Sequence, residues 1–336
     1  MRQHFVVRAL TAALLPFGLA ACGSVSVKVP VMRPAEINMA PYNTIGLGEF
    51  HYVGNGNAPR ALADNVEEAL VNSQRFKVID RARMADVMRE LKLSASDLAD
   101  PNSAAKLGKL VTAGALVFGD VEERYQEQAN DDHSQDKDGK PHTMHKLRGD
   151  ARVICNFKII DVSTGTLLIA KRYEETRSDT NYGQDATRPS PIDRESLFSS
   201  ARREVTGRFL KAIVPHQEYQ NADFQKDGDI PQLEGGIGWA ERGEWGKAQD
   251  AFTAAIGDSE KNPKIKSDQL AKAYGDLGLA YGFSGSYDKA FPMFDKAYQL
   301  SNDQMYLDQR DQVKRLQSDA QKVQTQTAPA GGPGVN

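Results

Sequence analysis

The sequence predicts an α/β domain followed by an all-α module. Up to about residue 216, short alternating segments typical of strands are interleaved with amphipathic helices. After residue 230, one spacing of small and aromatic residues occurs twice, which is typical of a helical repeat. The 336 residues are enough for two modest domains, which we place at 43–216 and 230–322.

The α/β part begins with an alternating strand over Thr44–Phe50, in which Gly46 and Gly48 predict a bulge or a close backbone approach. A helix over Ala58–Ser73 follows, with Leu62, Ala69 and Leu70 on one face. The other expected elements are a strand over 76–80, helices over 84–91 and 103–111, a strand over 115–121, a hairpin of 151–162 with 167–174, and a helix over 193–214.

Several segments of this part resemble CsgG-type domains. They are Pro34–Asn38, Ala69–Arg81, Ala104–Leu110, Phe118-Gly119 and Ile160–Gly165, and the resemblance covers roughly residues 34–215. It implies a CsgG-like sandwich of a mixed sheet and helices, and it implies no particular chemistry. The family includes the curli secretion channel of the outer membrane. The LpoB-type activators of cell-wall synthases are more distantly related in fold.

The repeated pattern has a 42-residue offset between its copies, from Ala248 to Ala290. Each copy has small residues where two antiparallel helices would approach, and aromatic residues to fill the space between pairs. The spacing resembles a tetratricopeptide repeat, which is usually about 34 residues long. The resemblance implies a groove for a protein partner, lined in part by Lys272, Leu279 and Phe283. A capping helix over about 303–322 and a disordered tail over 323–336 would complete the module.

The start of the chain resembles the signal and lipobox of bacterial lipoproteins. Arg2 and Arg8 precede a short apolar run, and this run leads into Leu19-Ala20-Ala21-Cys22. We expect residues 1–21 to be a cleaved signal peptide and Cys22 to carry lipid on its sulfur and amine. Gly23 and Ser24 bring no aspartate after the cysteine, which favours the periplasmic face of the outer membrane. Residues 22–42, with three prolines, would be an extended lipidated tether.

Composition argues against a general nucleic-acid binder, because the formal charge of −3 becomes −5 once Arg2 and Arg8 are removed. No nucleophile, P-loop or dinucleotide motif is present, so we expect neither an enzyme nor a cofactor. Cys155 alternates with apolar neighbours and should face a core as a free thiol. Three histidines, at positions 133, 142 and 145, lie among acids and could bind a metal, although a polar hairpin tip explains them without one.

Two insertions, 121–149 and 174–190, correspond to the segments that cross the membrane in the curli channel. A transmembrane strand needs apolar side chains on alternate positions. Here one face would carry Glu123 and Glu127, and the other Arg124 and Gln126. We therefore expect these insertions to stay in water. A true secretion channel would need them to form strands only within a ring of subunits.

The sequence favours an outer-membrane lipoprotein that works by adhesion, as a periplasmic adaptor or assembly factor in curli-like export or envelope biogenesis. Its partners would be the membrane, through lipid on Cys22, and proteins, through the helical repeats. A homo-oligomer is compatible with this. Three alternatives remain: an oligomeric CsgG-type channel, an LpoB-like activator of a cell-wall synthase, and a metal-dependent enzyme built on the histidine loop.

Overall fold

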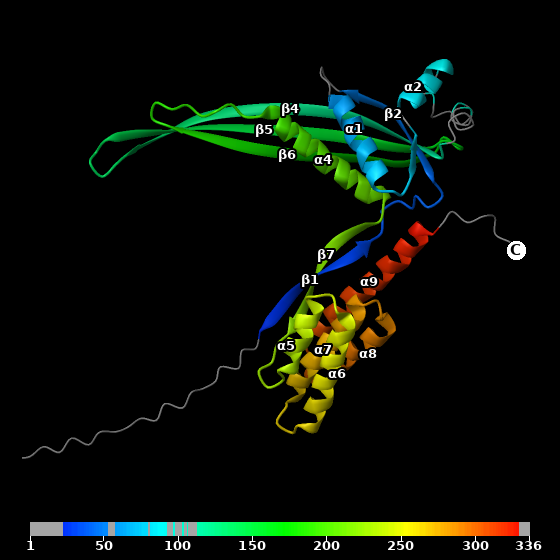
Figure 1. The fold of residues 1–336 in the computed structure, drawn as a ribbon, viewed down its shortest axis with the longest axis vertical. Coiled ribbons are helices and arrows are strands. Elements are labelled where there is room, and N and C mark those ends of the chain that lie inside the picture. The colour runs from blue at the N-terminus through cyan, green and yellow to red at the C-terminus, as the bar shows by residue number, and fades with distance from the viewer. Residues whose placement is uncertain are drawn as a thin grey trace, which may run out of the picture. The chain divides into compact units, whose positions relative to one another are not determined.

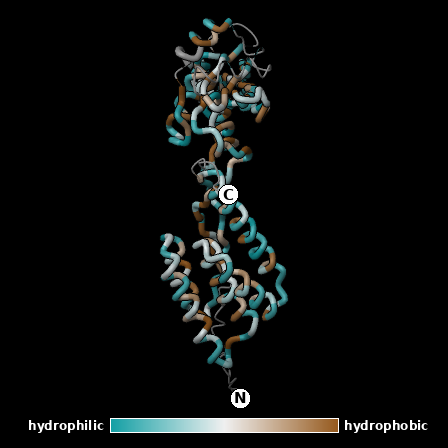
Figure 2. The backbone as a smooth tube through the Cα atoms, turned by 90° about the vertical axis from the view of Figure 1, so that its right-hand side faces the viewer, coloured by the Kyte–Doolittle hydropathy of each residue, from teal (hydrophilic) through white to brown (hydrophobic). Residues whose placement is uncertain are grey.

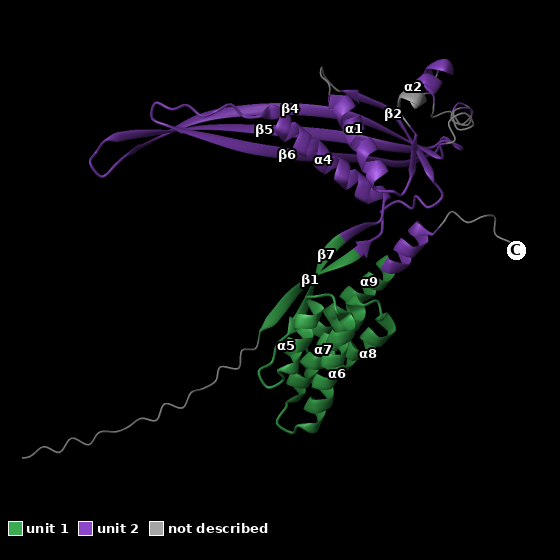
Figure 3. Ribbon diagram, in the orientation of Figure 1, with its two compact units in different colours: residues 1–31, 218–319 green, residues 32–217, 320–336 purple. Residues whose placement is uncertain are grey.

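The structure is a computed structural model that describes residues 23–52, 58–79, 81–92 and 113–328, together with residues 97, 103 and 106. The chain divides into two compact units, each described by itself (Figure 3). One unit holds residues 1–31 and 218–319, and is called the helical module. The other holds residues 32–217 and 320–336, and is called the sheet domain.

The sheet domain has one five-stranded mixed sheet in the order β3-β2-β4-β5-β6 (Figure 1). β2 (Thr44–Tyr52) runs parallel to both β3 (Lys77–Ile79) and β4 (Ala115–Gln135). β4, β5 (Pro141–Asp161) and β6 (Leu167–Gln184) are antiparallel to one another. The expected mixed sheet is therefore present, and the expected hairpin about Gly165 joins β5 to β6.

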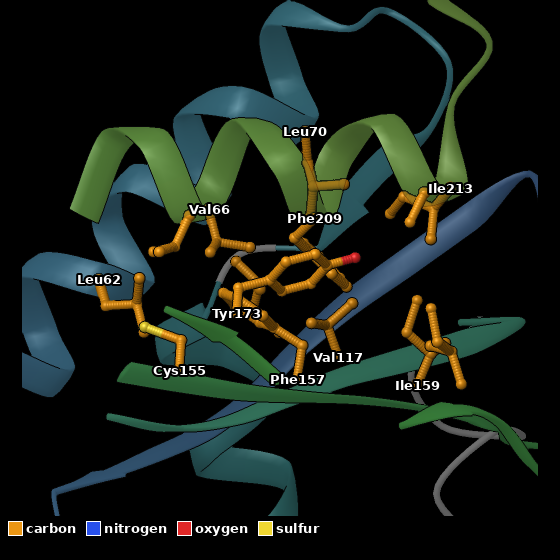
Figure 4. Packing of buried hydrophobic residues seen from close by; sticks show 14 of the residues in the cluster. Leu62, Val66, Leu70, Val117, Cys155, Phe157, Ile159, Tyr173, Phe209 and Ile213 are labelled. Atoms are coloured by element: carbon orange, nitrogen blue, oxygen red, sulfur yellow. The ribbon is translucent and has the colours of Figure 1, made fainter. Parts of the chain in front are cut away.

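One face of this sheet is covered by α1 (Ala58–Asn72) and α4 (Arg194–Ile213), both expected from the sequence. The amphipathic spacing of α1 turns Leu62, Val66 and Leu70 toward the sheet, where all three are fully buried. Phe209 of α4 stacks on Phe157 of β5, with ring centroids 4.2 Å apart (Figure 4). These contacts form the core of the sheet domain.

The opposite face of the sheet packs against α2 (Arg81–Glu90), where Met88 meets Leu116 and Phe118. These two β4 residues alternate with Val117, which faces the other core, as the two-residue period of a strand requires. The base of the domain is thus a sheet with helices on both sides. Of the helix expected over 103–111, the structure describes residues 103 and 106 alone.

Gly48 confirms the bulge or close approach expected within the first strand. The register between β2 and β4 shifts between Leu47 and Phe50. A Cβ at Gly48 would run into the ring of Phe118, so the strand comes close to that ring only because glycine stands there.

The helical module contains the five expected helices (Figure 1), the last of which extends into the residues of the other unit. They are α5 (Gln232–Ala240), α6 (Trp245–Lys261), α7 (Ser267–Phe283), α8 (Tyr287–Ser301) and α9 (Met305–Thr327). The two copies of the pattern form equivalent hairpins: Gly243 turns α5 into α6 with φ +72°, and Gly285 turns α7 into α8 with φ +85°.

The two hairpins also share one interior contact. Gly236 of α5 lies against the ring of Phe252, and Gly278 of α7 lies against the ring of Phe294. In each hairpin a Cβ on the glycine would meet the ring, so the small residue allows the two helices to pack closely. The repeat in the sequence therefore corresponds to two helical hairpins with the same interior contact.

The tether expected over 22–42 is wrong for its first part. β1 (Ser24–Arg33) is a strand that pairs with β7 (His216–Gln225) in a two-stranded ribbon. Val27 and Val29 of β1 are buried in the core of the helical module. The alternation of valines in this segment is the signal for a strand, and Pro30 is tolerated because β1 is paired on one side only. β7 covers most of the stretch between the two expected domains.

The expected tail is wrong over its first residues, because α9 continues to Thr327. The amide of Gln326 explains this order: its Oε1 accepts from Ala35 N and its Nε2 donates to Ala35 O, each at 2.8 Å. Both residues belong to the sheet domain. Residues 329–336 lie outside the described residues.

Candidate interaction surfaces

The sheet domain extends β4, β5 and β6 into a three-stranded arm (Figure 1). β4 makes its last pair with β2 at Val121 and continues to Gln135, about 48 Å farther at about 3.4 Å per residue. The two insertions therefore form strands within a single copy. The ring of subunits that the channel alternative required for these strands is not needed to form them, because β4, β5 and β6 satisfy one another's backbone groups.

Both faces of the arm are polar, as the sequence predicts. One face is covered by ion pairs between neighbouring side chains: Arg124 with Glu122, Arg148 with Asp150 at 3.0 Å, and Arg152 with Glu174 at 2.6 Å. Met144 and Tyr182 are the large apolar side chains that the described part of the arm exposes. No helix among the described residues is long and apolar enough to cross a membrane, and the hydropathy along the traced chain is correspondingly mixed (Figure 2).

A cluster of side chains, the tip clasp, holds the end of the arm: His142, His145, Asp131, Asp185 and Arg188. His145 is 7% exposed, with Nδ1 2.6 Å from Asp131 Oδ1 and Nε2 2.8 Å from Asp185 O. Asp185 accepts from Thr143 N through Oδ1, and its Oδ2 lies 3.0 Å from His142 Nδ1. The clasp thus ties the segment that follows β6 back to β5.

His145 has an acceptor near each ring nitrogen, so its imidazolium form can donate to both Asp131 and the carbonyl group of Asp185. The hydrogen bond to Asp131 raises the pKa of His145, and the same bond lowers the pKa of Asp131. Arg188 lies 3.1 Å from His145 Nδ1 and opposes the imidazolium. The protonated form of His145 therefore belongs to the closed clasp.

The histidines and the thiol serve structural contacts. Among the described residues, no group of three or more histidine, cysteine, aspartate or glutamate side chains is arranged to hold a metal ion. His133 contacts Thr143 Oγ1 at 3.1 Å and stands apart from the clasp contacts. Cys155 is fully buried, and burial raises the pKa of its thiol to about 12. The expectation that Cys155 faces a core as a free thiol is confirmed.

The three residues expected to line a groove on the helical module make contacts within that module. Lys272 Nζ lies 2.8 Å from Oδ2 of Asp227, a residue that is 3% exposed. Leu279 is fully buried in the core that also holds Phe224 of β7. Phe283 stacks on Trp245, with ring centroids 6.0 Å apart.

The assignment of Lys272, Leu279 and Phe283 as an open partner groove is therefore wrong. Lys272 is paired with Asp227, in the loop after β7, and Leu279 has no exposed surface with which to line a groove. The sequence signal that could have shown β7 is the alternation of Ala222 and Phe224, two buried residues between the two expected domains.

Side-chain amides close the outer edge of β7, as a neighbouring strand would. Gln312 of α9 donates to Asn221 O at 2.8 Å, and Gln309 of α9 donates to Asp223 O at 3.0 Å. Two residues farther along the strand, Gln225 N donates to Asp276 Oδ1 at 2.9 Å. Alternate residues of one edge are thus bound by α9 and α7, so β7 is an integral part of the helical module.

Burial of the Asp276 carboxyl group costs free energy in this arrangement. It is 1% exposed, burial raises its pKa well above the usual carboxyl range, and its Oδ2 has no hydrogen-bond partner among the described residues. The buried Tyr306 has its pKa raised as well, by burial and then by Asp276. The carboxyl group is therefore held in place for its bond to β7 and sits in a site that disfavours its charge.

Cys22, the expected lipid attachment site, lies outside the described residues. Gly23 is the first described residue, and its carbonyl oxygen accepts from Lys226 N at 2.8 Å. The ordered ribbon therefore begins one residue after the expected attachment site.

Comparison with known proteins agrees with the resemblance found in the sequence. Residues 37–188 match the family model described as "Curli production assembly/transport component CsgG". The comparison with curated proteins finds no match.

Similar solved structures include the LpoB C-terminal domain from Salmonella enterica (14% identity, 40% of this chain and 83% of that chain, TM-score 0.25). A PelC dodecamer from Paraburkholderia phytofirmans is 14% identical over 56% of this chain and 96% of that chain, with a TM-score of 0.26. The lipoprotein GNA1162 from Neisseria meningitidis is 11% identical over 50% of this chain and 96% of that chain, with a TM-score of 0.30. The family match locates the relationship in the sheet domain and its arm: the chain contains a CsgG family domain at residues 37–188.

Proposed function

We propose that this protein is a non-enzymatic lipoprotein of the outer membrane that serves as an assembly factor in export or envelope biogenesis. The CsgG family domain supports the assembly role. Lipid on Cys22 would supply the anchor, because several acyl chains at about 0.8 kcal/mol per buried CH₂ bind a membrane stably. The periplasmic face is proposed on the absence of an aspartate after that cysteine.

The observation that carries the proposal is the arm, which presents two long strand edges on a charged and solvated sheet. β6 is the edge strand of the sheet, and beyond Val121 no described strand pairs with the side of β4 that faces away from β5. Free backbone groups along such edges can bind an added strand from a partner. Charged side chains along the arm would limit this to matching partners.

Both arm edges suit a protein partner better than a membrane. Glu122, Arg124 and Arg152 lie on one face, and Glu127 and Asp179 on the other. An arginine facing lipid costs about 2–4 kcal/mol at the bilayer midplane. We propose that the arm works in water and that the helical module, which resembles tetratricopeptide repeats, offers its outer surface to a further protein.

A photo-crosslinking experiment in cells tests this proposal. A photoreactive residue replaces Thr180 of β6 in the full-length protein, and a matched variant carries it at Thr253, an exposed residue of α6. Defined crosslinked species from position 180 that differ from any obtained at position 253 would support the arm as the assembly surface. Crosslinks from neither position, in protein located at the outer membrane, would refute it.

The alternatives predict other results in the same preparation. An oligomeric channel requires a closed ring in mild detergent, seen by mass photometry and negative-stain microscopy, and conductance in planar bilayers. An activator of the LpoB type requires a crosslink to a cell-wall synthase. Monomers or dimers without conductance would remove the channel and leave the assembly factor.

A further inference from the structure

The first strand of the helical module begins directly after the expected lipid-bearing residue. Gly23 is hydrogen-bonded to Lys226 through its carbonyl group, and β1 starts at Ser24. Adjacent Cα atoms are about 3.8 Å apart, so Cys22 is held within one residue of this ribbon. The chain therefore has no free linker between the lipid and the helical module.

We infer that, once Cys22 carries lipid, one end of the helical module is held against the phospholipid surface. This inference depends on the proposed function, which includes the lipid at Cys22. We call this end the anchor end and define it by Gly23, the loop 226–231 and the loop 262–266. The occupant of the surface is the membrane that receives the acyl chains of this same polypeptide.

Hydrogen bonds place the two loops of the anchor end together. Gln269 Nε2 donates to Asp229 Oδ2 at 2.7 Å and to Asp227 Oδ1 at 3.0 Å, and its Oε1 accepts from Lys266 N at 3.0 Å. Gln269 thus joins the loop that follows β7 to the loop between α6 and α7. Gln232, at the start of α5, donates to Asp258 Oδ2 near the end of α6 at 3.2 Å.

The helices define an opposite end that lies well away from the anchor end. α7 starts beside Lys266 and runs 17 residues to Phe283, which is about 25 Å at 1.5 Å per residue. α5 runs in the same sense as α7 within the repeat, so the loop 241–244 lies at the far end. The inference therefore predicts a difference in membrane distance of about 25 Å within one compact unit.

The charges at the anchor end do not favour an anionic phospholipid surface over a neutral one. The anchor end carries exposed Lys261, Lys264 and Lys266, but acids stand close by at Asp229 and Glu234. Lys226 is already paired with Glu234 at 3.6 Å. The lysines and acids offset one another, so the short covalent spacing to the lipid fixes the end of the module that contacts the bilayer. A neutral phospholipid surface should serve as well as an anionic one.

Quenching by lipids with a spin-labelled headgroup tests the inference in vesicles. The full-length acylated protein receives a fluorophore at Lys264→Cys on the anchor end, or at Glu241→Cys on the far end as the matched control. Both sites are exposed loop positions. The unsubstituted protein checks that the buried Cys155 stays unlabelled. We expect quenching severalfold stronger at position 264 than at position 241, in both neutral and anionic vesicles.

A second variant separates the short spacing from other causes. A flexible insertion of eight glycine and serine residues between Gly23 and Ser24 leaves both label sites unchanged and should abolish most of the difference. Equal quenching at the two sites in the acylated protein, or stronger quenching at 241, would overturn the inference alone. A mass spectrum without acyl chains on Cys22 would overturn the lipoprotein proposal, and this inference with it.

Discussion

Arg202 is the residue whose loss should weaken the sheet domain in the most informative way. Its side chain is 4% exposed on α4, and its Nε lies 3.4 Å from Oε1 of Glu123 on β4, whose side chain is 13% exposed. It also pairs with Glu195, which is largely exposed. Burial raises the pKa of Glu123, and the neighbouring Arg202 opposes that rise by favouring the carboxylate.

We predict that Arg202→Met destabilises the sheet domain by about 3 kcal/mol. Removing one partner of a buried ion pair costs about 3–5 kcal/mol, because the other charge stays buried without compensation. We take the lower end because Glu123 retains some exposure and Glu195 can turn to water. At about 1.4 kcal/mol per tenfold, this is an increase of about 100-fold in the open population.

The thiol of Cys155 measures this opening. Both tryptophans of the chain, Trp239 and Trp245, lie in the helical module and do not report on the sheet domain. Cys155 is fully buried in the same core, and its pKa of about 12 keeps it unreactive until the core opens. With Cys22 replaced by serine, the rate of thiol labelling gives the open population directly.

The matched control is Arg203→Met, which removes an exposed arginine one position away. Its guanidinium group donates to Ser199 Oγ. This control should leave the labelling rate within a factor of two or three. Arg202→Met combined with Glu123→Gln should recover much of the loss, because no buried charge remains. An unchanged rate in the single variant, or a double variant as fast as the single, would refute this reasoning.

Three further predictions concern the module and the arm. Gly278→Ala should destabilise the helical module by about 1–3 kcal/mol because a Cβ there would lie 2.9 Å from a packed ring. Gly257→Ala, with open space around it, should instead stabilise the module by up to about 1 kcal/mol. Urea unfolding followed by tryptophan fluorescence checks both, and equal signs would contradict the packing argument. By NMR, the pKa of His145 should lie above its ordinary value of 6.5 and should fall on Asp131→Asn. The folded form of His145 binds its proton more tightly, so the clasp is stabilised at low pH and that contribution is lost as pH rises through the raised pKa; an unshifted titration would contradict it. Because the pKa of Asp276 is raised, the unfolding free energy of the module should fall as pH rises above the usual carboxyl range, and Asp276→Asn should flatten this dependence. An unaltered pH profile in urea unfolding would contradict that assignment.

Local patterns in the sequence were enough to predict the core of each unit. Leu62 and Leu70 on one side of α1, and the strand alternation around Cys155, depend on contacts between near neighbours in the chain, and the structure buries all three. Gly48 was recognisable because a glycine inside a strand has few uses. The two helical hairpins were visible because their glycine and aromatic spacing occurs twice.

The ribbon of β1 and β7 was missed because its two strands stand nearly 200 residues apart in the chain. β7 is not strongly apolar: it buries Ala222 and Phe224, and backbone carbonyl groups of its polar residues accept from glutamines of α9. A segment with so few apolar residues is typical of a connector. The edge of β7 is hydrogen-bonded by residues of α7 and α9, which lie far from it in the sequence. A local sequence pattern does not reveal those contacts.

The paired strands of the arm bear on the alternative that this protein is a membrane channel. Its strands pair within one copy, so a ring is not needed to form them, and the remaining question is which surroundings they tolerate. Arg124, Arg148 and Arg152 share one face, and at up to about 2–4 kcal/mol each they would cost about 6–12 kcal/mol per copy at a bilayer midplane. The other face offers no better surface, because Glu127 and Asp179 lie on it. If copies of this protein assemble side by side through their arm edges, the polar faces predict a sheet with water on both sides, which should give a closed ring in detergent and no conductance in a planar bilayer.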